Sequence, residues 1–140
     1  MITNRGKEAE AVNSLVQPGL DPQYTAFFER FNQQLFYEAH EVLEPLWLAQ
    51  RKQPDGRYYK GLIQLAGAFV HLQKRRRQPA VSLLRLAQSN VQLYPAVHHR
   101  LDLAVVLELI EDWLGKLEAD ALDGHALLIR HAPKLHLRQS

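Results

Sequence analysis

Apolar residues recur three and four positions apart along most of this chain, which is the period of an amphipathic α-helix. The first clear run follows Asp21-Pro22, a pair typical of a helix start, because aspartate caps free backbone amides and proline suits the first turn. One face of this run carries four aromatic residues, Tyr24, Phe27, Phe28 and Phe31. The pattern therefore predicts a first helix that extends from Pro22 through Phe31.

A second helix is predicted from about Phe36 to Gln50. At about 100° per residue, one stripe of this segment carries Phe36, His40, Leu43, Glu44 and Trp47, and Glu41 lies on its flank. Pro45 lies in the interior, where a proline removes one backbone donor and costs about 3 kcal/mol in an unkinked helix. We therefore expect a kink or a local change of shape near Glu41.

After a turn at Gln53–Gly56, a third helix is predicted from Tyr58 to about Lys74. Its apolar residues cover most of the circumference, which is typical of a buried central helix. The exceptions form a thin polar stripe of Lys60, Gln64 and His71, with Gly67 and Ala68 between the last two. Such small residues either allow close packing or leave room for a ligand.

Two further helices are predicted at about residues 79–93 and 98–117, with one more short helix in the tail, and no stretch alternates as a useful strand would. The predicted fold class is therefore all-α: a compact single-domain bundle of about five helices around a buried central helix at about residues 58–74. Residues 1–20 lack periodicity and are expected to form a flexible arm. Residues 21–140 then make up the helical bundle domain.

The composition narrows the classes of protein that remain. The chain has 140 residues, the size of one domain, and no cysteine, which excludes disulfide scaffolds, thiol nucleophiles and cysteine-bound zinc. The longest nearly apolar segment, Gly61 to Leu72, is too short and too polar to span a bilayer, and no signal-peptide pattern is present. A net charge of +2 is weak support for any charged partner. We therefore expect a cytoplasmic protein without membrane contact.

Two motifs in the middle of the chain are similar to a known pattern. The segment FYEAHEVLEPLW begins at Phe36, and KGLIQLAGAFVHLQ begins at Lys60. With Asn32 before them, they resemble the signature of small all-helical bacterial and archaeal proteins catalogued as a domain of unknown function, number three hundred and nine. That signature is Asn, then aromatic-Glu-Ala-His-Glu-x-Leu-Glu-x-x-Trp, then Gly-Leu-Ile-Gln. The resemblance covers roughly residues 27–94.

This resemblance implies a compact helical bundle but no biochemical activity, because the family has none established. The chain also differs from the family pattern at two places. Family members usually have glycine at the position of Gln34, and often a Gly-Asn turn at the position of Arg75-Arg76. Pro45 is a further unusual feature of this chain.

The strongest candidate chemistry involves His40 and Glu44, which lie four residues apart and so project from one helix face. Such a pair can bind a divalent metal, zinc or manganese, with His71 as third ligand and Glu41 as base or fourth ligand. The alternative is a structural network without metal, in which Glu44 accepts hydrogen bonds from His40, Gln64 or a tyrosine. We favour the structural network, because only one His-Glu pair has convincing spacing.

Two other chemistries are open but less well supported. His40 and Glu41 would make a metal-free acid–base pair if the small residues of the third helix left a substrate pocket. The basic run from Lys74 to Arg77 invites a nucleic-acid partner, but positive charge also complements a helix C-terminus, and no aromatic residues are interleaved. The remaining histidines have no ligand-like spacing and are expected mostly at the surface: His98, His99, His125, His131 and His136.

The leading hypothesis is a non-catalytic helical domain that binds a protein partner or a small ligand. In this hypothesis His40, Glu44, Gln64 and His71 form an internal polar network, and Trp47 packs beside them. The alternatives are a metal-dependent hydrolase, with His40 and Glu44 as ligands and Glu41 as base, and nucleic-acid binding through Lys74–Arg77. The broad apolar faces of the first and fifth predicted helices leave a homo-oligomer open.

Overall fold

The computed structural model describes residues 19–119 and 124–139, and in this part the chain forms six helices and one small hairpin. The predicted arm at residues 1–20 lies outside the described residues except for Gly19 and Leu20. The elements are α2 (Pro22–Asn32), α3 (Phe36–Gln50), α4 (Gly56–Gln73), α5 (Arg77–Val91), β1 (Val97–His98), β2 (Leu101–Asp102), α6 (Leu103–Ala119) and α7 (His125–Arg130).

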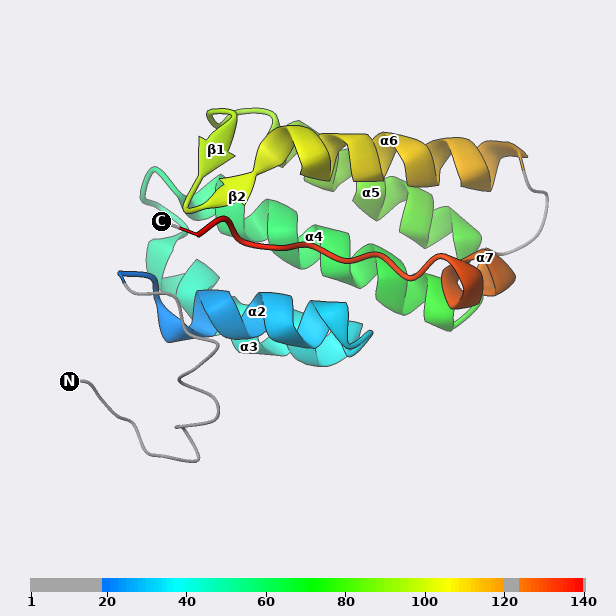
Figure 1. Ribbon diagram of the computed structural model, residues 1–140, viewed down its shortest axis with the longest axis horizontal. Coiled ribbons are helices and arrows are strands. Elements are labelled where there is room, and N and C mark those ends of the chain that lie inside the picture. The colour runs from blue at the N-terminus through cyan, green and yellow to red at the C-terminus, as the bar shows by residue number, and fades with distance from the viewer. Residues whose placement is uncertain (1–18, 120–123, 140) are drawn as a thin grey trace.

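Helix α4 is the centre of the bundle, as its apolar circumference predicts. Figure 1 shows α2 and α3 on one side of it and α5 and α6 on the other, and α4 contacts α3, α5 and α7. Its side chains Leu62, Leu65, Phe69 and Leu72 are fully buried. The predicted all-α bundle around a central helix is therefore confirmed.

The local signals for helix ends explain most boundaries. The Asp21 carboxylate accepts a hydrogen bond from the Gln23 amide at 2.7 Å and so caps α2, as predicted. Helix α3 continues through Pro45, whose side chain is exposed, so the proline does not end the helix. The bend that we expect there stays a prediction.

Gln34 and Arg75 adopt the left-handed backbone conformation, with φ of 65° and 59°. Each follows a helix end that closes with a hydrogen bond spanning six residues, from Leu35 to Arg30 and from Arg76 to His71. Glycine is the usual residue at such a position because it has no Cβ to clash. These turns keep the backbone shape that the family pattern implies while carrying long side chains.

The predicted start of the fifth helix at His98 is wrong. Residues 97–102 form a hairpin instead, with Val97 paired to Asp102 and His98 paired to Leu101. Helix α6 begins only at Leu103, because the Asp102 carboxylate accepts hydrogen bonds from the two amides of Ala104 and Val105 and caps the helix there.

The C-terminal segment crosses the bundle from α7 to the hairpin (Figure 1). The Asn32 amide holds its middle, because Asn32 Nδ2 donates to the Leu135 carbonyl and Asn32 Oδ1 accepts from the Leu135 amide, both at 2.7 Å. Further on, the Arg138 amide donates to the Arg100 carbonyl at 2.7 Å. The segment thereby supports the hairpin turn. No described helix is long and apolar enough to cross a membrane.

Candidate functional site

The side chains that the sequence singles out lie on the neighbouring helices α3 and α4. His40, Glu44 and Trp47 are half-buried on α3, whereas Glu41 is exposed. Gln64 and His71 are half-buried on α4. The core contacts of α3 are made by other residues, the buried Phe36, Ala39, Leu43 and Leu46. The candidate side chains are therefore at least partly accessible to solvent and lie outside the buried core.

Gln64 belongs to a hydrogen-bond network that joins α4 to α5. Its Oε1 accepts from Asn90 Nδ2 at 2.7 Å, and Asn90 Oδ1 accepts from Arg57 Nε at 2.8 Å. Asn90 is buried, so these bonds satisfy a polar group inside the bundle. An internal polar network is thus present, with partners that the sequence analysis did not include.

Trp47 connects α3 to α4 through a charged neighbour. The Lys60 ammonium lies 4.2 Å from the centre of the Trp47 ring, a cation–π contact. Trp47 is half-buried rather than part of the closed core. Lys60, Gln64 and Arg57 fall three, four and seven residues apart and so share one side of α4.

His40 and Glu41 both interact with Tyr37 on the same helix. The Tyr37 ring lies 5.9 Å from the His40 ring, and a hydrogen bond to the Glu41 carboxylate raises the pKa of the Tyr37 hydroxyl. In the described residues no hydrogen bond joins any two of His40, Glu44, Gln64 and His71. None of these four residues belongs to a described group of three possible ligands that lie close enough to hold one metal ion. Their joint role in one network or metal site stays a prediction.

His71 lies at the far end of α4, with a buried Nδ1 that has no partner in the structure as described. Burial, Arg76 and Lys74 together lower the pKa of His71. The basic run beside it has a structural use, because the Arg77 guanidinium donates two hydrogen bonds to the Leu117 carbonyl near the end of α6. That use accounts for one of the charges that invited a nucleic-acid hypothesis.

A second cluster, which the sequence analysis missed, lies where the hairpin meets the start of α4. Asp55 Oδ1 lies 2.8 Å from His98 Nε2, and Asp55 Oδ2 lies 2.6 Å from His99 Nε2. His98 and His99 are half-buried and share one carboxylate, so this pair departs from the expectation that the remaining histidines lie mostly at the surface without ligand-like spacing. Across residues 19–119 and 124–139, this is the one trio of possible metal ligands whose atoms all lie within 4.8 Å of one another.

Four tyrosines surround this trio. The Tyr24 and Tyr58 hydroxyls lie 2.6 Å apart, Tyr24 donates to the His99 carbonyl at 2.9 Å, and Tyr58 donates to the His98 carbonyl at 3.2 Å. The Tyr94 hydroxyl holds the turn before α4 by donating to the Pro54 carbonyl at 2.7 Å. The Tyr59 ring lies parallel to the His99 ring, with centres 6.2 Å apart. The tyrosines thus hold both the hairpin that carries the histidines and the turn that carries Asp55.

The electrostatics of the cluster favour an ionised Asp55. Burial would raise the pKa of Asp55, but the hydrogen bonds from His99 and His98 outweigh burial, so the pKa is lowered. Burial and the nearby Asp55 charge raise the pKa of Tyr59 to about 12, so its hydroxyl stays protonated. The trio therefore presents one carboxylate and two imidazoles.

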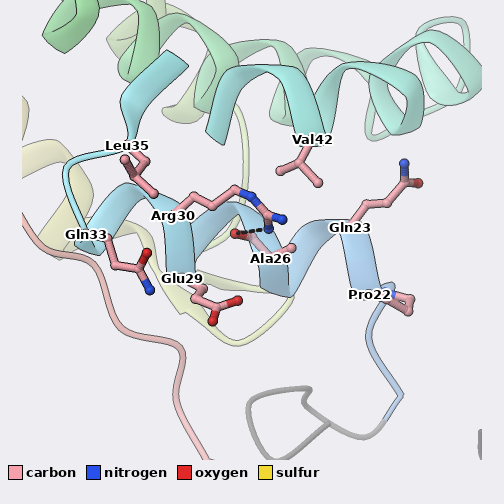
Figure 2. A pocket seen from close by; sticks show the side chains of 8 residues that line it. All are labelled: Pro22, Gln23, Ala26, Glu29, Arg30, Gln33, Leu35 and Val42. Atoms are coloured by element: carbon pink, nitrogen blue, oxygen red, sulfur yellow. Dashed lines mark hydrogen bonds between the residues drawn. The ribbon is translucent and has the colours of Figure 1, made fainter. Parts of the chain in front are cut away.

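A groove of about 450 Å³ lies between α2 and α3. Figure 2 shows the side chains that line it. Its lining mixes apolar side chains such as Leu35 and Val42 with Glu29 and Arg30, and Arg30 Nη1 donates to the Ala26 carbonyl at 3.4 Å. None of the candidate site residues of α3 and α4 lines this groove. We therefore assign it no chemistry.

Comparison with known proteins agrees with the motifs on α3 and α4. Residues 24–83 match the family model described as "Domain of unknown function (DUF309)". This segment is a DUF309 domain. The match includes α2, α3, α4 and the start of α5, so it contains Asp55 and the motif residues but ends before the hairpin histidines.

The chain is also similar to a curated protein of no assigned function. The chain is 32% identical over 88 residues to the uncharacterized protein YpuF of Bacillus subtilis (strain 168). That alignment covers 59% of this chain and 49% of YpuF, so it spans about half the length of that relative. No solved structure matches the chain.

Proposed function

We propose that this protein is a non-catalytic binding domain that takes a small ligand with hydrogen-bond acceptors on the α3–α4 face. We define this face by Trp47, Arg57, Lys60 and Gln64. The ligand class that suits it carries a carboxylate or a phosphate, because Arg57 and Lys60 are cationic donors and Gln64 adds an amide donor.

The orientation of Gln64 carries this proposal. Asn90 donates to Gln64 Oε1, which fixes the amide and leaves both Nε2 hydrogens without an acceptor among the described residues. Lys60 and Arg57 lie on the same side of α4, and neither forms an ion pair within the described chain. Three donors with unused capacity beside a half-exposed tryptophan match an anionic acceptor group.

Binding is favoured over catalysis because the groups that a reaction would need are not joined to these donors. His40 and Glu44 form no hydrogen bond with Lys60 or Gln64 in the described structure. A general acid or base must reach its proton at hydrogen-bond distance.

We also place the protein in the cytoplasm, because a chain without cysteine fits a reducing compartment.

Tryptophan fluorescence tests the proposal directly. The chain has two tryptophans: Trp47 lies on the proposed face, and Trp113 is buried in the core. We expect a saturable change in emission when the untagged protein is titrated with inorganic phosphate, a dicarboxylate or a nucleoside monophosphate. The change should be absent in Trp47→Phe, which keeps Trp113 as an internal reference.

Two matched variants decide whether the amide is the binding group. Gln64→Ala should weaken binding of the responding probe by about tenfold or more, because one or two charge-assisted hydrogen bonds are lost. Gln92→Ala, at an exposed position on the end of α5, should leave the affinity unchanged. The proposal fails if no probe gives a saturable response, or if Gln64→Ala binds as tightly as Gln92→Ala.

A further inference from the structure

We propose that Asp55, His98 and His99 form a binding site for a divalent transition-metal ion of the zinc type. The site uses none of the side chains that define the α3–α4 face, and it lies at the junction of the hairpin with the first turn of α4. Its three ligand atoms already converge within 4.8 Å, so one ion can reach all of them with small side-chain movements.

The donor set determines the class of ion. Two imidazole nitrogens and one carboxylate suit zinc, cobalt, nickel or ferrous ions, whereas calcium and magnesium prefer shells made of oxygen. Zinc–nitrogen bonds of about 2.0–2.1 Å place tetrahedral ligand atoms about 3.3 Å apart. The present separations of 2.8 Å and 2.6 Å are those of hydrogen bonds, so an ion would replace the bridging protons and spread the ligands slightly.

The side chain of Asp55 does not cap the helix that it precedes. Asp55 occupies the N-cap position of α4, where aspartate normally accepts a hydrogen bond from a backbone amide of the first turn. It forms no such side-chain bond and instead directs both carboxylate oxygens to the two histidines. Both carboxylate oxygens are therefore committed to the two imidazoles rather than to the backbone of α4.

The hairpin turn holds the histidines in place at a cost in backbone energy. His99 and Arg100 form a two-residue turn with φ of 47° and 64°. This geometry favours Asn-Gly, because a Cβ is strained in the left-handed region. The carbonyls of His98, His99 and Arg100 are held in turn by Tyr58, Tyr24 and the Arg138 amide. The strain is thus offset by contacts that fix the two imidazoles beside Asp55.

The trio is accessible and coordinatively incomplete. The side chains of Asp55, His98 and His99 are 26%, 20% and 34% exposed, so an ion can enter from solvent. Three protein ligands leave at least one position of a tetrahedral ion for water or another small molecule. The parallel ring of Tyr59 forms one wall beside His99.

Metal titration of untagged, chelator-treated protein tests the proposal. Cobalt is the first probe, because a nitrogen–oxygen site that holds it in tetrahedral geometry gives visible absorption. We expect a band that saturates at one ion per chain and is displaced by zinc, and we expect zinc to raise the melting temperature. A wild-type protein that gives neither the band nor a thermal shift would overturn the proposal.

Matched variants locate the site. His99→Asn keeps a residue that tolerates the left-handed turn but removes the imidazole, and Asp55→Asn removes the charge with little change in shape. Both should weaken cobalt binding by more than about tenfold. His131→Asn, at an exposed histidine after α7, should bind as the wild type does.

The same variants separate a metal site from a purely structural network. If Asp55→Asn and His99→Asn lower the melting temperature but bind cobalt as tightly as His131→Asn does, the trio is structural and the proposal is wrong. The readout is independent of the α3–α4 face, since it uses neither Trp47 fluorescence nor an anionic probe.

Discussion

Replacing glycine by alanine in two helices should change stability in opposite directions, and this contrast tests the packing of α4 against α5. Gly61 is buried on α4, and an added Cβ would lie 3.1 Å from both Asn90 Cβ and Val91 Cγ2 on α5. Gly115 is exposed on α6, and an added Cβ would meet nothing within 4 Å. The two substitutions are chemically identical and differ only in their surroundings.

The magnitudes follow from two terms. Alanine gains about 1 kcal/mol of helix propensity over glycine at either position. At Gly61 an overlap with two side chains of a neighbouring helix costs about 1–3 kcal/mol. Gly115→Ala should therefore raise the free energy of unfolding by about 1 kcal/mol, whereas Gly61→Ala should lower it by up to about 2 kcal/mol.

Urea unfolding followed by circular dichroism measures both values, provided that the slope against urea is the same in each variant. The reasoning is refuted if Gly61→Ala stabilises the protein as much as Gly115→Ala does. That result would mean that α5 does not approach α4 closely at Gly61 and that the small residue leaves free space instead.

Three further predictions concern other parts of the fold. Gln34→Gly should raise the free energy of unfolding by up to about 1 kcal/mol in urea titrations, because it removes a left-handed long side chain. Tyr58→Phe should lower it by about 1–3 kcal/mol and reduce the melting temperature, because the His98 carbonyl loses a buried donor. Because the pKa of His71 is lowered in the folded chain, the unfolded chain takes up this proton first as the pH falls through about 6.5, so stability should fall there. His71→Gln should flatten this dependence in melting curves measured across that range.

The helices were predictable because amphipathic periodicity over ten or more residues leaves few alternatives. The central place of α4 followed from its nearly complete apolar circumference. The hairpin was not predictable, since each strand has two residues and shows no alternation. Its turn carries His99-Arg100 in place of the Asn-Gly that would have signalled it. A better signal was Asp102, which caps α6 and marks where the helix begins.

The two candidate sites differ in how far the sequence could predict them. The residues of α3 and α4 were found because their spacing is local and places them on helix faces. Asp55 and His98 lie 43 positions apart, so their contact depends on how the hairpin folds back over α4. Asp55 also has an ordinary interpretation as a turn residue before glycine. The adjacent pair His98-His99 was the one other sign of this site in the sequence. The sequence around the pair does not show which distant residue would be the third ligand.

The first turn of α4 explains how one short segment contributes to both proposed sites. Successive residues point about 100° apart around a helix. Asp55 therefore faces the hairpin, Arg57 reaches Asn90 on α5 as a member of the α3–α4 face, and Tyr58 faces the core. Gly56 fixes this turn, because a Cβ there would lie 2.4 Å from the Arg51 carbonyl oxygen at the end of α3. The backbone path is therefore set by the close approach of the two helices, and the side chains are free to serve different partners. A change in the Asp55 side chain should accordingly leave the donors of the α3–α4 face where they are.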